Sequence, residues 1–172
     1  MLNLLPSMFV LGLAALIALL LVQARLSLPG MVAERGAAAR ALAIAVVVQA
    51  AHFAEETASG LPQRLPALFD LPPIPFSLFV AFNLVWLGIW IASVPALKSR
   101  LPAAFFAAWF LAVAGIVNGI VHPLLAAVAR DYFPGLVSSP VMGVVSAWLW
   151  VRLHRATVPR ATPTDAASRP TT

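Results

Sequence analysis

Residues 101–129 read LPAAFFAAWFLAVAGIVNGIVHPLLAAVA, an unbroken run in which no side chain carries a formal charge. A hydrocarbon core of about 30 Å is crossed by ~20 mainly apolar helical residues, so this run is long enough to span a bilayer. Pro102 suits the first turn of a helix, because proline lacks an N–H group that would have no partner there. The run therefore predicts a transmembrane helix at about 102–129.

The composition of the whole chain agrees with a membrane protein. Of the 172 residues, 62% are hydrophobic and 10% are charged, whereas soluble domains carry about 25% charged residues. The length fits one domain. The net charge of +5 comes from basic residues that are scattered along the chain, so nucleic-acid binding is not expected. The absence of cysteine excludes disulfides, thiolate metal ligands and a cysteine nucleophile.

Four other uncharged runs are candidates for further spans. Residues 1–24, 71–97 and 132–151 are long enough, whereas residues 41–54 span only if their helix extends through His52, Glu55 and Glu56. The alternative for this short run is a segment that lies at the interface. We predict an all-α bundle of five transmembrane helices in residues 1–155, at about 3–24, 37–57, 76–97, 102–129 and 135–153.

The distribution of basic residues favours five spans and sets the orientation. One side of such a bundle holds Arg25, Arg35, Arg40, Lys98, Arg100, Arg152, Arg155, Arg160 and Arg169. The other side holds only Arg64 and Arg130. Because basic residues favour cytoplasmic loops, we predict a multi-pass protein of the cell membrane with its N-terminus outside and its C-terminus in the cytoplasm.

Local sequence predicts the remaining boundaries. The first run lacks a basic n-region and is longer than a signal-peptide core, so we expect a retained helix. Residues 59–75 contain five prolines, so no regular helix is expected to run through them. Within them, residues 61–70 are amphipathic enough to rest on the outer interface. Residues 156–172 are rich in Pro, Thr and Ala and are predicted to form a disordered cytoplasmic tail.

A few polar residues fall inside the predicted spans, where ionisable side chains are costly and mark functional sites by default. They are Gln49, His52, Glu55, Glu56, Asn83, Asn118 and His122. The first four lie within an arc of about 120° on one helix, at 100° per residue. Two buried glutamates side by side do not both ionise unless a cation or a proton lies between them. This face therefore predicts a metal site or an acid–base pair.

The topology brings these residues from three helices to one depth. Asn83 and His122 each lie about eight residues, or ~12 Å, from the outer end of their helices. His52, Glu55 and Glu56 lie in the last turns of theirs, so convergence in the outer half of the membrane is the favoured interpretation. The alternatives are interfacial glutamates, asparagines that only join helices, and a core histidine that donates to a carbonyl. Gly115 and Gly119 predict a close-packing face.

The motif His52-Phe-Ala-Glu55-Glu56 is accompanied by other characteristic elements. These are a proline-rich stretch, Asn83, the pair Asn118 and His122, and Arg130-Asp131-Tyr132-Phe133-Pro134-Gly135-Leu136-Val137. Over roughly residues 40–150 the chain resembles the HXXEE-domain family of small bacterial and archaeal integral membrane proteins. The resemblance implies that His52, Glu55, Glu56, Asn83, Asn118 and His122 are the family's polar positions, and it implies no particular reaction.

We predict a membrane-embedded enzyme that acts on a lipid or isoprenoid substrate from the outer leaflet. His52, His122 and one of Glu55 and Glu56 would hold a metal ion such as zinc or mononuclear iron, and the other glutamate would act as base. Without a metal, His52 and the glutamates could shuttle protons. The alternatives are a small transporter or proton relay, for which a homo-oligomer would supply the missing symmetry, and a non-catalytic assembly protein.

Overall fold

The computed structural model describes residues 5–25 and 32–157, and over these residues the chain is helical and contains no strand. The helices are α1 (Leu5–Arg25), α2 (Val32–Ala58), α3 (Leu61–Ala67), α4 (Phe76–Ala96), the short 3₁₀ helix η2 (Leu97–Ser99), α5 (Pro102–Ala129) and α6 (Ser139–Ala156). The observed long helices match the predicted segments to within a few residues at each end.

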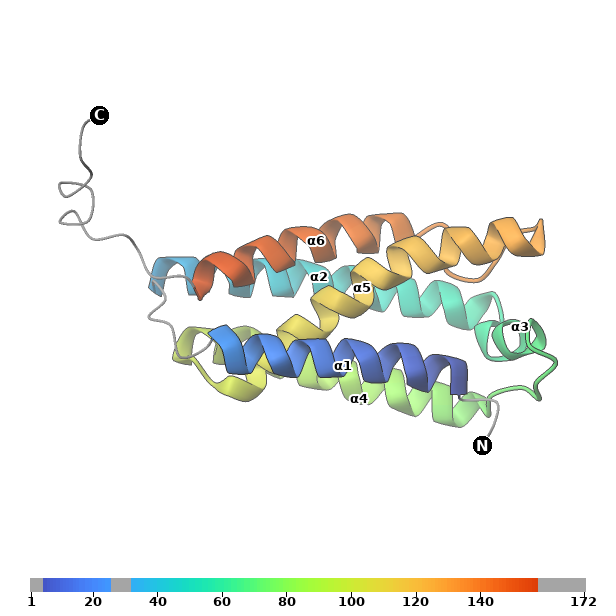
Figure 1. Ribbon diagram of the computed structural model, residues 1–172, viewed down its shortest axis with the longest axis horizontal. Coiled ribbons are helices and arrows are strands. Elements are labelled where there is room, and N and C mark those ends of the chain that lie inside the picture. Colours follow the sequence, from blue (N-terminus) through green and yellow to red (C-terminus); the bar gives the residue numbers. More distant parts are fainter. Residues whose placement is uncertain (1–4, 26–31, 158–172) are drawn as a thin grey trace, which may run out of the picture.

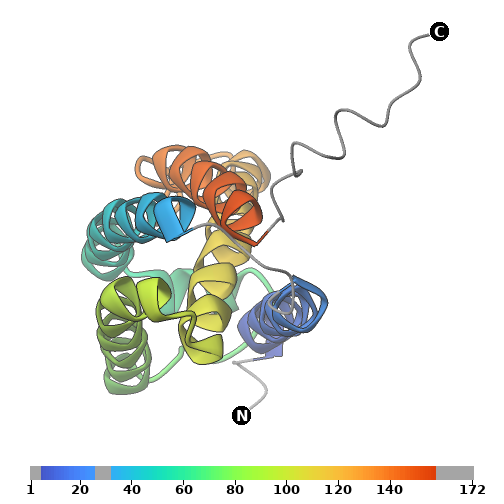
Figure 2. The same ribbon diagram turned by 90° about the vertical axis from the view of Figure 1, so that its left-hand side faces the viewer.

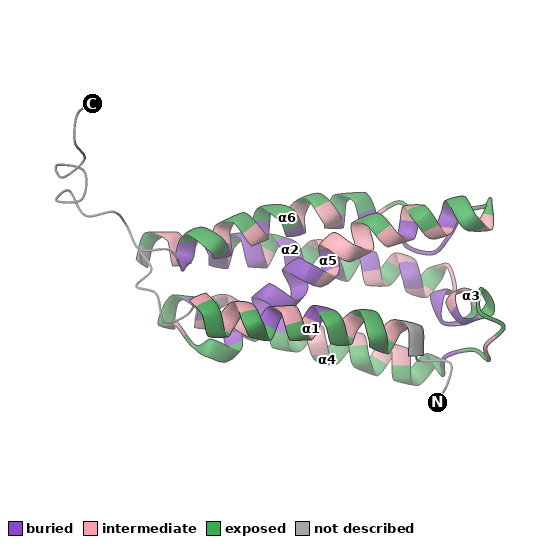
Figure 3. Ribbon diagram, viewed as in Figure 1, coloured by how far each residue is buried: buried purple, intermediate pink, exposed green. Residues whose placement is uncertain are grey.

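The long helices lie along one axis of the molecule, and the short α3 lies at the end where α5 turns into α6 (Figure 1). Helix α5 crosses from the side of α1 and α4 to the side of α6, and it occupies the middle of the bundle in the end view (Figure 2). Its first half is the most continuously buried part of the fold (Figure 3). The uncharged run of residues 101–129 therefore forms the central helix.

The surface of the bundle is apolar, as expected of a protein that is solvated by lipid. Exposed fractions of 74% for Val128, 71% for Val144 and 61% for Val85 would be costly in water. Helices α1, α2, α4 and α5 are long and apolar enough to cross a membrane. The chain is thus a helical, multi-pass membrane protein.

As predicted, no helix runs through the whole proline-rich segment, but a short one forms inside it. A seven-residue helix, α3, forms within residues 59–75 although it includes Pro62 and Pro66. Pro62 lies in the first turn, where no N–H donor is needed. Pro66 cannot donate to the Pro62 carbonyl, and the backbone N–H of Ile74 donates to that oxygen instead, at 2.8 Å. The returning chain thus supplies the hydrogen bond that proline removes.

Small residues allow α5 and α6 to pack closely, as predicted for Gly115 and Gly119. A Cβ atom on Gly119 would lie 2.6 Å from the Gly143 Cα atom of α6, and a Cβ on Gly115 would overlap the Ser146 side chain. No larger residue fits without moving the two backbones apart. This contact holds the second half of α5 against α6.

The antiparallel order of the helices gathers most basic residues at one end of the bundle, here called the basic end. Its described members are Arg25, Arg35, Arg40, Lys98, Arg100, Arg152 and Arg155. Arg25 also ties α1 to the end of α6, because its Nε donates to Thr157 Oγ1 at 3.0 Å and its Nη2 donates to the His154 carbonyl at 3.2 Å. Arg160, Arg169 and the predicted tail from residue 158 onward lie outside the described residues.

Replacing Gly119 with leucine should destabilise the bundle, because the new side chain would overlap Gly143. Overpacking of this kind costs about 1–3 kcal/mol, so the apparent melting temperature in detergent should fall clearly. Gly88→Leu is the matched control, since a Cβ at Gly88 has no neighbouring atom within 4 Å. Equal melting temperatures for the two variants would contradict the close contact.

Candidate functional site

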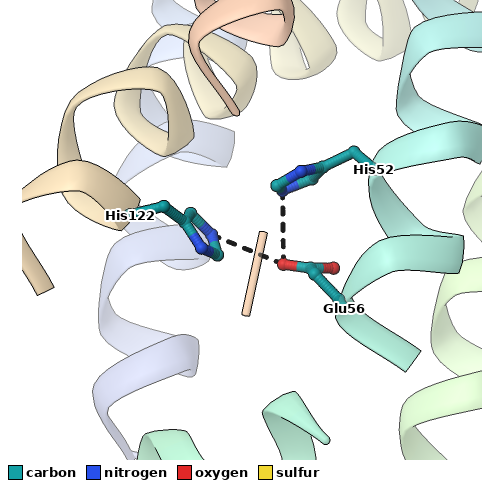
Figure 4. Close-up of side chains that lie close together, drawn as sticks. All are labelled: His52, Glu56 and His122. Atoms are coloured by element: carbon teal, nitrogen blue, oxygen red, sulfur yellow. Dashed lines mark ion pairs between the residues drawn. The ribbon is translucent and has the colours of Figure 1, made fainter. Parts of the chain in front are cut away.

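Three titratable side chains meet inside the bundle, at the end opposite the basic end, and are called the His/Glu trio below. Helix α2 supplies His52 and Glu56, one turn apart, and α5 supplies His122 (Figure 4). Glu56 Oε1 lies 3.3 Å from His52 Nε2 and 3.4 Å from His122 Nε2. All three side chains are buried, with exposed fractions of 0% for His52, 6% for Glu56 and 5% for His122.

A backbone carbonyl fixes the tautomer of His122. Its Nδ1 lies 2.5 Å from the carbonyl oxygen of Pro134, and a carbonyl oxygen only accepts hydrogen bonds. Nδ1 of His122 therefore carries the hydrogen and donates it to Pro134. The lone pair of a neutral His122 is then on Nε2, the atom that faces Glu56.

Ser138 fixes the tautomer of His52 in the same way, because its own hydroxyl is hydrogen-bonded to Glu55. The Ser138 hydroxyl donates its only hydrogen to Glu55 Oε2, so toward His52 Nδ1, at 2.7 Å, the serine oxygen must accept. His52 is therefore also protonated on Nδ1. The nearest donor to its Nε2 is the Asn118 amide, at 3.5 Å. Both imidazoles thus turn an Nε2 lone pair toward one carboxylate.

This arrangement needs a positive charge between its members. Two lone pairs and a carboxylate repel one another, and burial removes the water that would screen them. Protonating both histidines would place two cations in rings whose centroids are 4.9 Å apart. A shared proton or a divalent cation resolves the conflict, and candidate ligand atoms of the trio lie within 4.8 Å of one another.

Glu55 lies beside the trio, but both of its carboxylate oxygens accept hydrogen bonds from residues 132–138. Its Oε1 accepts from the Tyr132 hydroxyl at 2.6 Å and from the Val137 N–H at 3.0 Å. Its Oε2 accepts from the Ser138 N–H at 2.8 Å and from the Ser138 hydroxyl. Partial burial and the hydrogen bond to Glu55 raise the pKa of Tyr132, which keeps its hydroxyl a donor. Glu55 therefore anchors the α5–α6 connection.

The α5–α6 connection, residues 130–138, closes over the histidines at Gly135. This glycine has a φ of 85°, and a Cβ atom there would lie 2.6 Å from His122 Nδ1 and 2.8 Å from His52 Cε1. Only glycine meets both the backbone and the space requirement. Arg64 of α3 covers the connection from outside, with Nη2 3.3 Å from Asp131 Oδ2 and its guanidinium 6.0 Å from the Phe133 ring centre.

The structure brings together most, but not all, of the residues singled out in the sequence. Asn118 contacts the trio, and Gln49 is buried on the same helix as His52. Asn83 stays apart, because its amide donates to the Phe79 carbonyl of its own helix at 3.0 Å. The alternative in which His122 donates to a carbonyl holds for its Nδ1 and leaves its Nε2 free for Glu56.

Sequence reasoning from single residues missed three contributors, namely the Tyr132 hydroxyl, the Pro134 carbonyl and Gly135. The Pro134 carbonyl and Gly135 act through the backbone. Any residue type can supply a backbone carbonyl, so the sequence gives no sign of it, and a positive φ is indicated only by the glycine itself. The segment from Arg130 to Val137 entered only through the family resemblance. Ser138, just before the start of α6, is the link between Glu55 and His52.

Comparison with known proteins adds no further assignment, because no protein-family model, curated protein or solved structure matches the chain. Membership of the HXXEE-domain family therefore stays a prediction from the motif.

Replacing Glu55 with glutamine should weaken the connection over the trio. The amide nitrogen of glutamine cannot accept, so at least one of the four donors around Glu55 is left without a partner, at a cost of about 1–3 kcal/mol. We expect a lower melting temperature than in Asp70→Asn, which also removes one carboxylate but does so at an exposed position. Equal stability of the two variants would show that Glu55 is not an anchor.

Proposed function

We propose that the chain is a membrane-embedded metalloenzyme that holds one divalent ion on His52 Nε2, His122 Nε2 and Glu56. The observation that carries the proposal is the pair of imidazoles, each held by a donor bond at Nδ1 with its Nε2 aimed at the same carboxylate. Metal-bound histidines are typically oriented in this way, through a hydrogen bond from the other ring nitrogen.

The separations between the atoms support a small ion with nitrogen and oxygen ligands. Two ligands of a tetrahedral zinc ion, each bonded at ~2.0–2.1 Å, are roughly 3.3 Å apart. The distances from Glu56 Oε1 to the two Nε2 atoms are 3.3 and 3.4 Å. Two imidazoles and one carboxylate suit zinc or mononuclear ferrous iron, whereas a di-iron centre uses four glutamates and two histidines.

A metal ion held by these three protein ligands would keep a coordination position for a substrate and would supply Lewis acidity there. The chain's own residues divide the remaining work. Glu55, Ser138 and Pro134 orient the histidines, and Asn118 is the nearest neutral donor for a substrate. Because the sequence-based role of Glu55 as base requires a free oxygen lone pair, we assign it the anchoring role instead.

We further propose that the substrate is lipid-like and arrives from the outer leaflet. The trio lies in a bundle with an apolar surface and at the end opposite the basic end, which the positive-inside rule assigns to the cytoplasm. Helix α6 lies along the other long helices and would be the fifth span (Figure 1). This gives the cell-membrane topology with the N-terminus outside and the C-terminus inside, as the sequence predicts.

Metal analysis of the purified chain tests the proposal directly. We expect a single zinc or iron ion per chain in the wild type and almost none in His52→Ala, His122→Ala or Glu56→Gln. Ser138→Ala keeps the ligands but loses the partner of His52, so its metal affinity should fall about 10–100-fold. Asn83→Ala is the control and should bind as the wild type does.

Folded wild-type protein that fails to bind zinc or ferrous iron when these ions are supplied would overturn the metalloenzyme. Proton or cation uptake into liposomes that Glu56→Gln abolishes would instead favour the relay. Equal metal content in the Glu56→Gln variant would remove Glu56 from the ligand set.

The proposed topology can be tested with single cysteines, because the chain has none of its own. Arg64→Cys should react with an impermeant thiol reagent from outside the cell, and Lys98→Cys should react only after the membrane is opened. The reverse pattern would invert the orientation. Labelling of both positions from one side would contradict the crossing of the membrane by α4, the only long helix between them in the described part of the chain.

A further inference from the structure

A second feature lies at the basic end, far from the His/Glu trio. A hollow of about 320 Å³ lies between the start of α2 and the end of α4. Its lining consists of Gly36, Ala39, Arg40, Ala43, Val94 and Lys98. Figure 2 looks onto this end, where the two helices lie side by side. His52 lies about 18 Å further along α2, at 1.5 Å per residue, so the hollow is distinct from the metal site.

Two cations from separate elements share the hollow. Arg40 belongs to α2 and Lys98 to η2, both side chains are exposed, and the lining includes no acidic residue. Within the described ranges 5–25 and 32–157, neither forms a salt bridge. Arg and Lys are the side chains that bind phosphate groups, so this pair is suited to an anion.

The rest of the lining is apolar, and two of its residues, Ala43 and Val94, lie on the side of the cations that faces the middle of the bundle. Ala43 follows Arg40 by three residues on α2, and Val94 of α4 precedes Lys98 of η2 by four, so both lie closer to the middle of the bundle. Gly36 leaves the hollow open, because a Cβ atom there would meet only Arg40 Nη1, at 3.9 Å. The two cations thus lie nearer the end of the bundle, and Ala43 and Val94 lie nearer its middle. The headgroup and the acyl chains of a lipid follow the same order.

We propose that this hollow binds an anionic phospholipid, with its phosphate between Arg40 and Lys98 and its first acyl carbons against Ala43 and Val94. A free inorganic anion fits less well, because helical backbone N–H groups are already bonded and the remaining lining offers no polar donor. The proposal is independent of the metal site. It makes the basic end a lipid-recognition surface as well as a determinant of topology.

The test uses the full chain in zwitterionic nanodiscs, titrated with phosphatidylglycerol and followed by native mass spectrometry. A charge-assisted contact to the phosphate contributes about a tenfold gain in affinity, so Arg40→Gln/Lys98→Gln, which loses two such contacts, should bind about 100-fold more weakly. The control, Arg152→Gln/Arg155→Gln, removes the same charge from the same end outside the hollow and should bind nearly as the wild type does. Excess inorganic phosphate should not displace the lipid.

Gly36→Leu provides a second variant that keeps both charges and fills the hollow. Leucine is a better helix former than glycine, so this variant should fold and yet lose the bound lipid. Unchanged affinity in Gly36→Leu would overturn the proposal, as would equal losses in the two double variants, which would indicate general charge attraction. Displacement of the lipid by inorganic phosphate would reassign the hollow to a soluble anion.

Discussion

The candidate site depends on one constraint, namely that the hydrogen-bond partners of His52 and His122 allow only one neutral tautomer of each. Pro134 offers His122 only an acceptor, and Ser138, whose hydrogen is taken by Glu55, offers His52 only an acceptor. Both Nε2 atoms must then face Glu56 as lone pairs unless a second proton is added. In a buried, apolar surrounding this is an unfavourable arrangement of three electron-rich groups, and a cation converts it into a favourable one.

The remainder of the fold serves to keep this arrangement in place. The glycine contact between α5 and α6 brings the connection from Arg130 to Ser138 over the trio, where Gly135 touches both rings. Glu55 then fastens that connection through four hydrogen bonds, at Tyr132, Val137 and Ser138. Neighbouring glutamates of one motif thus have different tasks, with Glu56 in the trio and Glu55 in the structure that orients it.

Much of this could be predicted from the sequence because a bilayer simplifies the rules. Uncharged runs of sufficient length predicted the long helices to within a few residues, and the i, i+4 spacing placed His52 and Glu56 on one face.

The expected depth in the membrane placed His122 and Asn118 at the same level. It could not exclude Asn83, because depth says nothing about the direction in which a side chain points, and this amide bonds its own helix. Nor could it separate Glu55 from Glu56, since that difference arises from backbone N–H groups of a distant connection. The short α3 was missed because the Pro62 carbonyl, to which Pro66 cannot donate, accepts a hydrogen bond from the backbone N–H of Ile74, outside the helix.

The central claim is most directly tested by long-range ¹H–¹⁵N NMR of the histidine side chains, of which the chain has only three. We predict that His52 and His122 are neutral Nδ1–H tautomers in the metal-loaded protein, with Nε2 resonances shifted to the values of metal-bound imidazole. His154, at the basic end, should not respond to the metal and serves as the internal reference. Spectra in which both His52 and His122 are doubly protonated, and in which added zinc changes neither, would contradict the account and identify the trio as an ion-pair cluster.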